Sequence, residues 1–132
     1  MTAGGFAIIR LKFGSLSQEA VDNINLIVET CEKYNLSYPQ TSYVLATVAW
    51  ETARTFKPIE EYGKGKGRKY GTWYTNTKGV KYGIAGSGGS TYLYSDYPHL
   101  YYGRGHTQNT WLDNYKYIKQ RTGVDVVNNP SL

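Results

Sequence analysis

The chain has 132 residues, of which 40% are apolar and 19% are charged, a balance typical of one globular domain of ordinary size. Its net charge of +5 favours acidic partners, such as an anionic wall polymer, but no nucleic-acid-binding motif accompanies it, so we expect no nucleic acid partner. The lone cysteine, Cys31, excludes an internal disulfide, and we expect it to be buried in a helix.

The N-terminal segment MTAGGFAIIR contains an apolar run too short for a signal peptide or a membrane span. We therefore expect synthesis in the host cytoplasm without a signal peptide, and no stable membrane insertion. A protein that acts on the wall would then depend on another factor for its release.

A first helix is predicted after Ser17, a good N-cap, and it closes at Tyr34. Its apolar residues fall mainly on one helical face: Val21, Ile24, Leu26, Ile27, Val28 and Cys31.

A second helix is predicted after a break at Pro39, with Thr41 or Ser42 as its cap. Its apolar stripe consists of Val44, Leu45, Val48 and Ala49. Glu51 lies two turns after Val44 and so emerges at the edge of this stripe. We expect the helix to end by Arg54 or Thr55, because Pro58 disfavours helix in the residue before it.

Residues 62–105 are rich in Gly, Tyr and Thr, which predicts loops with short strands or hairpins. A third helix is predicted from Thr107 to a stop at Gly123, with a buried face of Trp111, Tyr115 and Ile118. The expected class is therefore mainly α (α+β), in a single domain that spans residues 1–132.

Two acids ten positions apart, Glu51 and Glu61, occur in the segment WETARTFKPIEEY (residues 50–62). Cleavage of a glycosidic bond needs one carboxylic acid that donates a proton and one carboxylate that accepts one. The apolar stripe and the negative end of the helix dipole would both favour the neutral form of Glu51. Glu60 and Glu61 are adjacent and should point in different directions, so one can face a substrate. Each acid taken alone also fits an ordinary surface residue.

A polar face formed by Thr107, Thr110 and Asn114 could hold water or sugar hydroxyls, or simply meet solvent. His99 and His106 have no further ligands at suitable spacing, so we expect no metal and no cofactor. The cations at positions 64, 66, 68 and 69 fit a solvated loop.

Three segments, residues 48–65, 101–115 and 124–130, together resemble glycoside hydrolases of family 19. The resemblance covers roughly residues 40–132 and is closest to phage and prophage endolysins that cut the glycan strands of peptidoglycan, with plant chitinases as more distant relatives. It implies a lysozyme-like, mostly helical fold with a cleft between lobes, a Gly/Tyr-rich loop or hairpin region between helices, and an inverting mechanism.

The catalytic residues follow from this resemblance position by position. The general acid of the family matches Glu51, and its general base best matches Glu61, with Glu60 as the alternative. The hydroxyl that helps hold the attacking water matches Thr110.

The substrate-binding residues implied by the same motifs are Gln108, Asn114, Tyr102 and, if it is not the base, Glu60. The chain departs from the family at Trp50, where histidine is frequent, and at Asn109, where leucine is usual. Its last residue, Leu132, comes before the further helices of other members, which predicts a truncated or unusually small lobe. Residues 72–98 form an insert with no assigned role.

The sequence thus predicts a monomeric endo-glycosidase (muramidase type) that hydrolyses peptidoglycan glycan strands. The alternatives are a chitinase acting on N-acetylglucosamine polymers, and a non-catalytic glycan-binding or virion structural module on the same scaffold. A lytic transglycosylase, which needs only one acid, is a further possibility.

Overall fold

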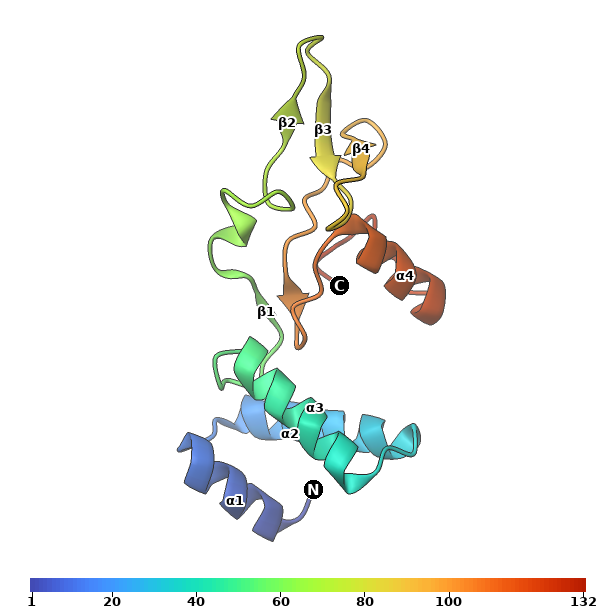
Figure 1. The fold of residues 1–132 in the computed structure, drawn as a ribbon. Helices are drawn as coiled ribbons and strands as arrows, with labels where there is room; N and C mark the ends of the chain where they lie inside the picture. Colours follow the sequence, from blue (N-terminus) through green and yellow to red (C-terminus); the bar gives the residue numbers. More distant parts are fainter. The chain divides into compact units, whose positions relative to one another are not determined.

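Helices occupy the first part of the chain, and short strands with one helix occupy the second. The computed structural model describes residues 1–132, which form two compact units, Met1–Pro58 and Ile59–Leu132 (Figure 1). The expected mixture of helices and strands is confirmed. None of the helices combines the length and apolar character that a bilayer crossing requires.

Helix α1 (Ala3–Phe13) was not predicted from the sequence. Thr2 caps it by accepting a hydrogen bond from the backbone N–H of Gly5, and Gly14 ends it with a φ of 85°. Its apolar residues surround the helix axis and form no single stripe, so the usual periodic signal is missing. Phe6 is its one buried side chain.

Helix α2 (Gln18–Lys33) confirms the first predicted helix, with Ser17 as N-cap and Tyr34 as C-cap. Its buried face consists of Ala20, Ile24, Val28 and Cys31. Leu26, which was assigned to this face, is 57% exposed, because it lies two positions from Ile24 and so turns toward solvent.

Helix α3 (Tyr38–Glu51) begins earlier than predicted. Ser37 is its N-cap, and the side chain of Gln40 accepts from the backbone N–H of Ser37, so Thr41 and Ser42 lie inside the helix. Pro39 falls in the first turn, where its missing N–H has no intrahelical partner to lose. The prediction that Pro39 breaks the chain before this helix is therefore wrong.

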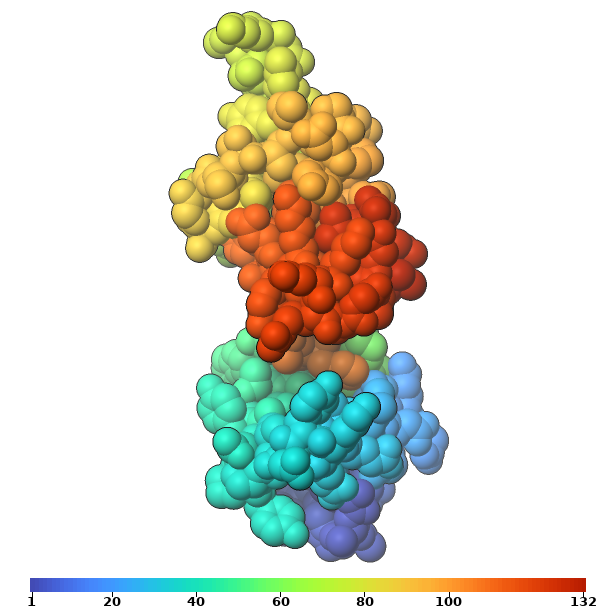
Figure 2. Space-filling view, turned by 90° about the vertical axis from the view of Figure 1, so that its right-hand side faces the viewer, coloured from blue at the N-terminus to red at the C-terminus, as the bar shows by residue number.

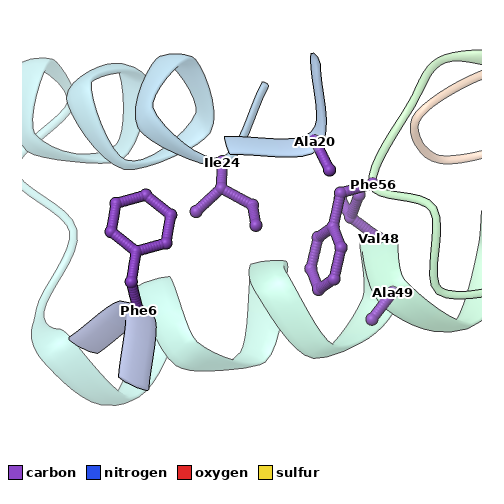
Figure 3. Packing of buried hydrophobic residues seen from close by; sticks show 6 residues of the cluster. All are labelled: Phe6, Ala20, Ile24, Val48, Ala49 and Phe56. Atoms are coloured by element: carbon purple, nitrogen blue, oxygen red, sulfur yellow. The ribbon is translucent and has the colours of Figure 1, made fainter. Parts of the chain in front are cut away.

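The core of the first unit lies among the three helices and the turn after α3 (Figure 3). In this view Phe6 and Ile24 point toward each other across the core, and Phe56 lies beside Val48. Ile24, Val48 and Phe56 are each at most 1% exposed. Burial of these side chains is what holds the three short helices together.

The second unit contains two small antiparallel sheets. The first sheet pairs β1 (Ile59–Glu60) with β5 (Arg104–Gly105). The second sheet has the order β2 (Tyr74–Thr75), β3 (Lys81–Ile84) and β4 (Thr91–Leu93). The tip between β2 and β3 projects beyond the rest of this unit (Figure 2).

Tyrosines make up half of the buried core of the second unit. Tyr101 donates to the carbonyl of Val127, and burial raises the pKa of its phenol to about 12, so it remains a donor at neutral pH. A Cβ on Gly83 would lie 2.5 Å from the ring of Tyr92, so the glycine makes room for the tyrosine. The buried residues of this core are Ala85, Tyr92, Tyr101, Leu112, Tyr115 and Val127.

Helix α4 (Leu112–Thr122) begins five residues later than predicted. Gln108 and Trp111 have φ values of 50° and 75°, which an α-helix does not allow, and Arg104 and Asn109 form a β-bridge instead. Trp111 is therefore not part of the helix face, whereas Leu112, fully buried, is. Gly123 ends the helix in the left-handed conformation, as predicted.

The segment after α4 is fixed by Asp125. Its carboxylate accepts from Lys119 at 2.8 Å and from the side-chain and backbone nitrogens of Asn128 at 2.8 and 3.2 Å. The Lys119 hydrogen bond first, and then those of Asn128, lower the pKa of Asp125 from its ordinary 3.8 to about 2. The ionised form is thus stabilised by folding.

Asp125→Asn should therefore change the pH dependence of stability. A carboxyl with a depressed folded pKa stabilises the fold above its ordinary value, and this stabilisation is lost as pH falls from about 4 to about 2. Urea unfolding between pH 7 and pH 2 should give the variant lower stability at pH 7 and a flatter decline below pH 4. Asn128→Ala, which removes one of the three donors, should be intermediate. Equal slopes for wild type and Asp125→Asn would contradict this role.

Candidate functional site

The carboxylate of Glu61 is held by two uncharged donors. Tyr70 Oη donates to Oε1 at 2.8 Å, and the backbone N–H of Gly103 donates to Oε2 at 3.1 Å. Pairing of β1 with β5 brings residue 61 opposite residue 103, and the N–H of Glu61 donates to the carbonyl of Gly103 at 2.7 Å. Glu61 is half-buried, so its carboxylate has a fixed orientation and remains in contact with solvent.

Tyr70 reaches Glu61 from the far end of a glycine-rich loop, residues 62–71. Gly71 packs directly on Gly65, because a Cβ on Gly71 would lie 1.9 Å from the carbonyl oxygen of Gly65. The ring of Tyr70 also meets Trp111 edge-on, with centroids 5.0 Å apart. Burial and the hydrogen bond to Glu61 raise the pKa of Tyr70, so its hydroxyl stays protonated and donates.

Glu60 has charged partners instead. Its Oε1 accepts from Tyr102 at 3.0 Å and from Arg104 at 3.3 Å, and its Oε2 lies 3.4 Å from Lys64. The hydrogen bond from Tyr102, supported by those from Lys64 and Arg104, lowers the pKa of Glu60 against a smaller opposing effect of burial. Glu60 and Glu61 thus lie in different environments, as expected for adjacent acids.

Arg104 connects Glu60 to the core of the second unit. Its guanidinium lies 3.6 Å from the ring centroid of Tyr102 and donates to the hydroxyl of buried Tyr115 at 3.0 Å. Tyr115 in turn donates to the carbonyl of Tyr102 at 2.9 Å. Stacking on an aromatic ring together with hydrogen bonds from two of its nitrogens holds Arg104 in one orientation.

Gln108 lies beside Glu61. Its Nε2 donates to the carbonyl of Ile59 at 3.0 Å, and a Cβ on Gly103 would lie 2.6 Å from its Oε1 and 3.3 Å from Glu61 Oε2. The absence of a side chain at Gly103 therefore lets both groups approach the same stretch of backbone.

Two further predicted residues follow Gln108 in a chain of hydrogen bonds. Thr110 Oγ1 donates to the carbonyl of Gln108, and Asn114 Nδ2 donates to the carbonyl of Thr110, both at 2.8 Å. The Thr110 hydroxyl proton is thus used within the protein, and its oxygen remains an acceptor. Tyr102 donates to Glu60, so its hydroxyl proton is also engaged.

Glu51 is the last residue of α3, in the first unit, and is half-buried. The next residue, Thr52, is completely buried, and the chain then turns through Ala53 and Arg54 with φ values of 49° and 67°. A shallow hollow of about 390 Å³ adjoins this turn. Its lining residues all belong to the first unit and are Ala49, Trp50, Ala53 and Arg54.

Sequence reasoning did not connect Tyr70, Gly103 and Arg104 with the two acids. Tyr70 lies nine residues after Glu61 and Gly103 lies 42 residues after it, separations at which no local pattern links them. The one available signal was the alternation of glycine with other residues around positions 63–71 and 103–105, which indicates close backbone approach.

Comparison of the chain with family models, with curated proteins and with solved structures found no match. The features that bear on function are those of the chain's own residues: a carboxylate held by neutral donors, a neighbouring carboxylate paired with cations, and an acid at the end of α3.

Proposed function

We propose that the protein is an inverting endo-glycosidase, built on a lysozyme-like scaffold, that hydrolyses the glycan strands of peptidoglycan. Glu51 donates a proton to the leaving glycosidic oxygen, and Glu61 removes a proton from the attacking water. Inversion requires the two carboxyl groups to stand about 6.5–9.5 Å apart around the substrate, so that one water fits between the base and the sugar.

The observation that carries the proposal is the environment of Glu61. A general base needs an ionised carboxylate in a fixed orientation with a lone pair left for water. Each oxygen of Glu61 accepts one bond from a neutral donor, which leaves such lone pairs available. The Glu60 carboxylate is instead paired with the cations Lys64 and Arg104, which stabilise its ionised form and make it a weaker base. This difference favours Glu61 over Glu60.

Gln108 and Thr110 fit a supporting role beside the base. The side-chain oxygen of Gln108 lies next to Gly103 and Glu61, and the Thr110 oxygen can accept a hydrogen bond from water or from a sugar hydroxyl. Asn114 donates to the backbone carbonyl of Thr110 and would affect substrate binding by fixing the position of Thr110.

The charge distribution supports an anionic substrate. Residues 59–132 contain ten Lys and Arg against five Asp and Glu, which gives +5, whereas residues 1–58 contain five of each and are neutral. Four of these cations follow Glu61 within eight residues, at positions 64, 66, 68 and 69, and all are exposed. Peptidoglycan carries carboxylates and chitin does not, so this charge favours peptidoglycan, with an effect that salt weakens.

A second candidate is a non-catalytic glycan-binding or virion structural module. The rings of Tyr74 and Tyr82 stack across β2 and β3, 5.7 Å apart, on the opposite face of the sheet from buried Tyr92. Such a half-exposed aromatic surface suits binding to a polysaccharide or to another protein without any chemistry.

Incubation of the purified protein with peptidoglycan tests these functions together. The proposal predicts new reducing ends, with the α/β configuration inverted, and Glu51→Gln should lower their rate by about 10² to 10⁴. Anhydro ends would identify a transglycosylase, and cleavage of chitin in preference to peptidoglycan would identify a chitinase. Binding without new ends would support the module. Full activity in both Glu51→Gln and Glu61→Gln would exclude the two-carboxylate mechanism.

A further inference from the structure

An exposed indole stands immediately before the proposed acid. Trp50 is 82% exposed, although a tryptophan in water leaves one of the largest apolar surfaces of any side chain unburied. It lines the hollow of about 390 Å³ together with Ala49, Ala53 and Arg54. The volume is at the small end of the range for ligand sites, which suits a single sugar ring.

The wall of this hollow is built on a fixed turn. Thr52 Oγ1 donates to the carbonyl of Val48 at 2.7 Å and accepts from the N–H of Phe56 at 2.9 Å. The N–H of Arg54 donates to the carbonyl of Ala49 at 2.6 Å. These bonds hold Ala53 and Arg54 in the left-handed region, where each non-glycine residue costs about 1 kcal/mol or more. Strain of this kind is found where a site is formed before its ligand binds.

The apolar indole face and the cationic guanidinium that line the hollow point to one ligand chemistry. The flat face of an indole packs well on the C–H face of a pyranose ring. The guanidinium of Arg54 takes part in none of the ion pairs of its unit, and an arginine binds a carboxylate through two parallel hydrogen bonds. A ring with a carboxylate substituent would satisfy both groups at once.

We propose that this hollow is a subsite for one carboxylate-bearing pyranose ring, with Trp50 against the ring and Arg54 on the carboxylate. The subsite deepens the proposed function and rests on it, because it would position the sugar next to Glu51. It also gives the chain a means of preferring an acidic glycan over a neutral one, separate from the general attraction of the basic second unit.

Binding is best measured in the full chain carrying Glu61→Gln, so that hydrolysis does not consume the ligand. Two tetrasaccharides of equal length serve as probes: alternating N-acetylglucosamine and N-acetylmuramic acid with free lactyl carboxylates, and neutral chitotetraose. Titration calorimetry gives a Kd for each. We expect the carboxylated probe to bind at least tenfold more tightly, and the preference to shrink as salt is raised.

Two variants separate the contribution of the Arg54 guanidinium from that of the Trp50 ring. Arg54→Gln should weaken only the carboxylated probe and bring the two Kd values within about threefold of each other. Trp50→Ala should weaken both probes by about tenfold or more. Tyr43→Ala is the matched control, since Tyr43 is 75% exposed on α3, seven residues before Trp50, and does not line the hollow; it should bind as the parent does.

The subsite is overturned if Arg54→Gln keeps the preference, if Tyr43→Ala weakens binding as much as Trp50→Ala, or if the parent binds neither probe. These outcomes are independent of cleavage. If the wild type produces new reducing ends but Arg54→Gln and Trp50→Ala bind both probes as the parent does, the subsite is rejected and the hydrolytic function stands. The expected binding pattern without any reducing ends would support the subsite and reject the hydrolytic mechanism.

Discussion

Glu61→Gln is expected to slow glycan cleavage by about 10² to 10⁴ while leaving the fold intact. The factor is the usual contribution of a general base. Glutamine has the same shape as glutamate but cannot take a proton from water at neutral pH. New reducing ends per minute, measured on purified peptidoglycan, give the rate, and circular dichroism with urea unfolding checks the fold.

The fold should survive because both hydrogen bonds can be kept. The N–H of Gly103 can only donate, so the amide oxygen of the new side chain must face Gly103. Its NH₂ group then faces Tyr70, whose hydroxyl oxygen can accept. No buried group is left without a partner, so the stability should change by less than about 1 kcal/mol.

Glu60→Gln is the matched control, because it changes the neighbouring acid in the same way. Its side chain can still accept hydrogen bonds from Tyr102 and Arg104, and what is lost is the charge of the ion pairs with Lys64 and Arg104. We expect cleavage to fall by less than about tenfold, because a surface ion pair contributes only about 0–1 kcal/mol. The reverse pattern, a large loss in Glu60→Gln and a small one in Glu61→Gln, would make Glu60 the base.

Gly71→Ala should be the most damaging single substitution for the fold of the second unit. The added Cβ would lie 1.9 Å from the oxygen and 2.1 Å from the carbonyl carbon of Gly65, and neither backbone atom can rotate away. The loop must therefore open, which withdraws Tyr70 from Glu61 and from Trp111. We expect a loss of about 3 kcal/mol or more in urea unfolding, together with loss of cleavage.

Gly88→Ala provides the control for this substitution. No atom lies within 4 Å of a Cβ at Gly88, and its φ is not in the left-handed region, so alanine should fit without strain. Its stability should stay within about 0.5 kcal/mol of wild type. Equal stability of the two variants would show that the contact between Gly65 and Gly71 is not needed.

Local sequence rules predicted those elements whose signals lie inside the element. Ser17 caps α2, and Gly123 ends α4 in the conformation that glycine adopts without cost. Glu51 was placed near the end of α3, where it is found. The prediction was wrong at Pro39, which can break a helix or occupy its first turn; the capping box of Ser37 and Gln40 places it in the first turn.

The candidate site depended on contacts between residues far apart in the chain. The sequence by itself determined that acids, glycines and tyrosines gather around positions 51–71 and 101–115, because composition and spacing are properties of the chain. Only the tertiary structure decided that Glu61 faces Tyr70 and Gly103 whereas Glu60 faces Arg104 and Lys64. The physical reason is that a hydrogen bond depends on distance in space, which the pairing of β1 with β5 and the approach of Gly65 to Gly71 set.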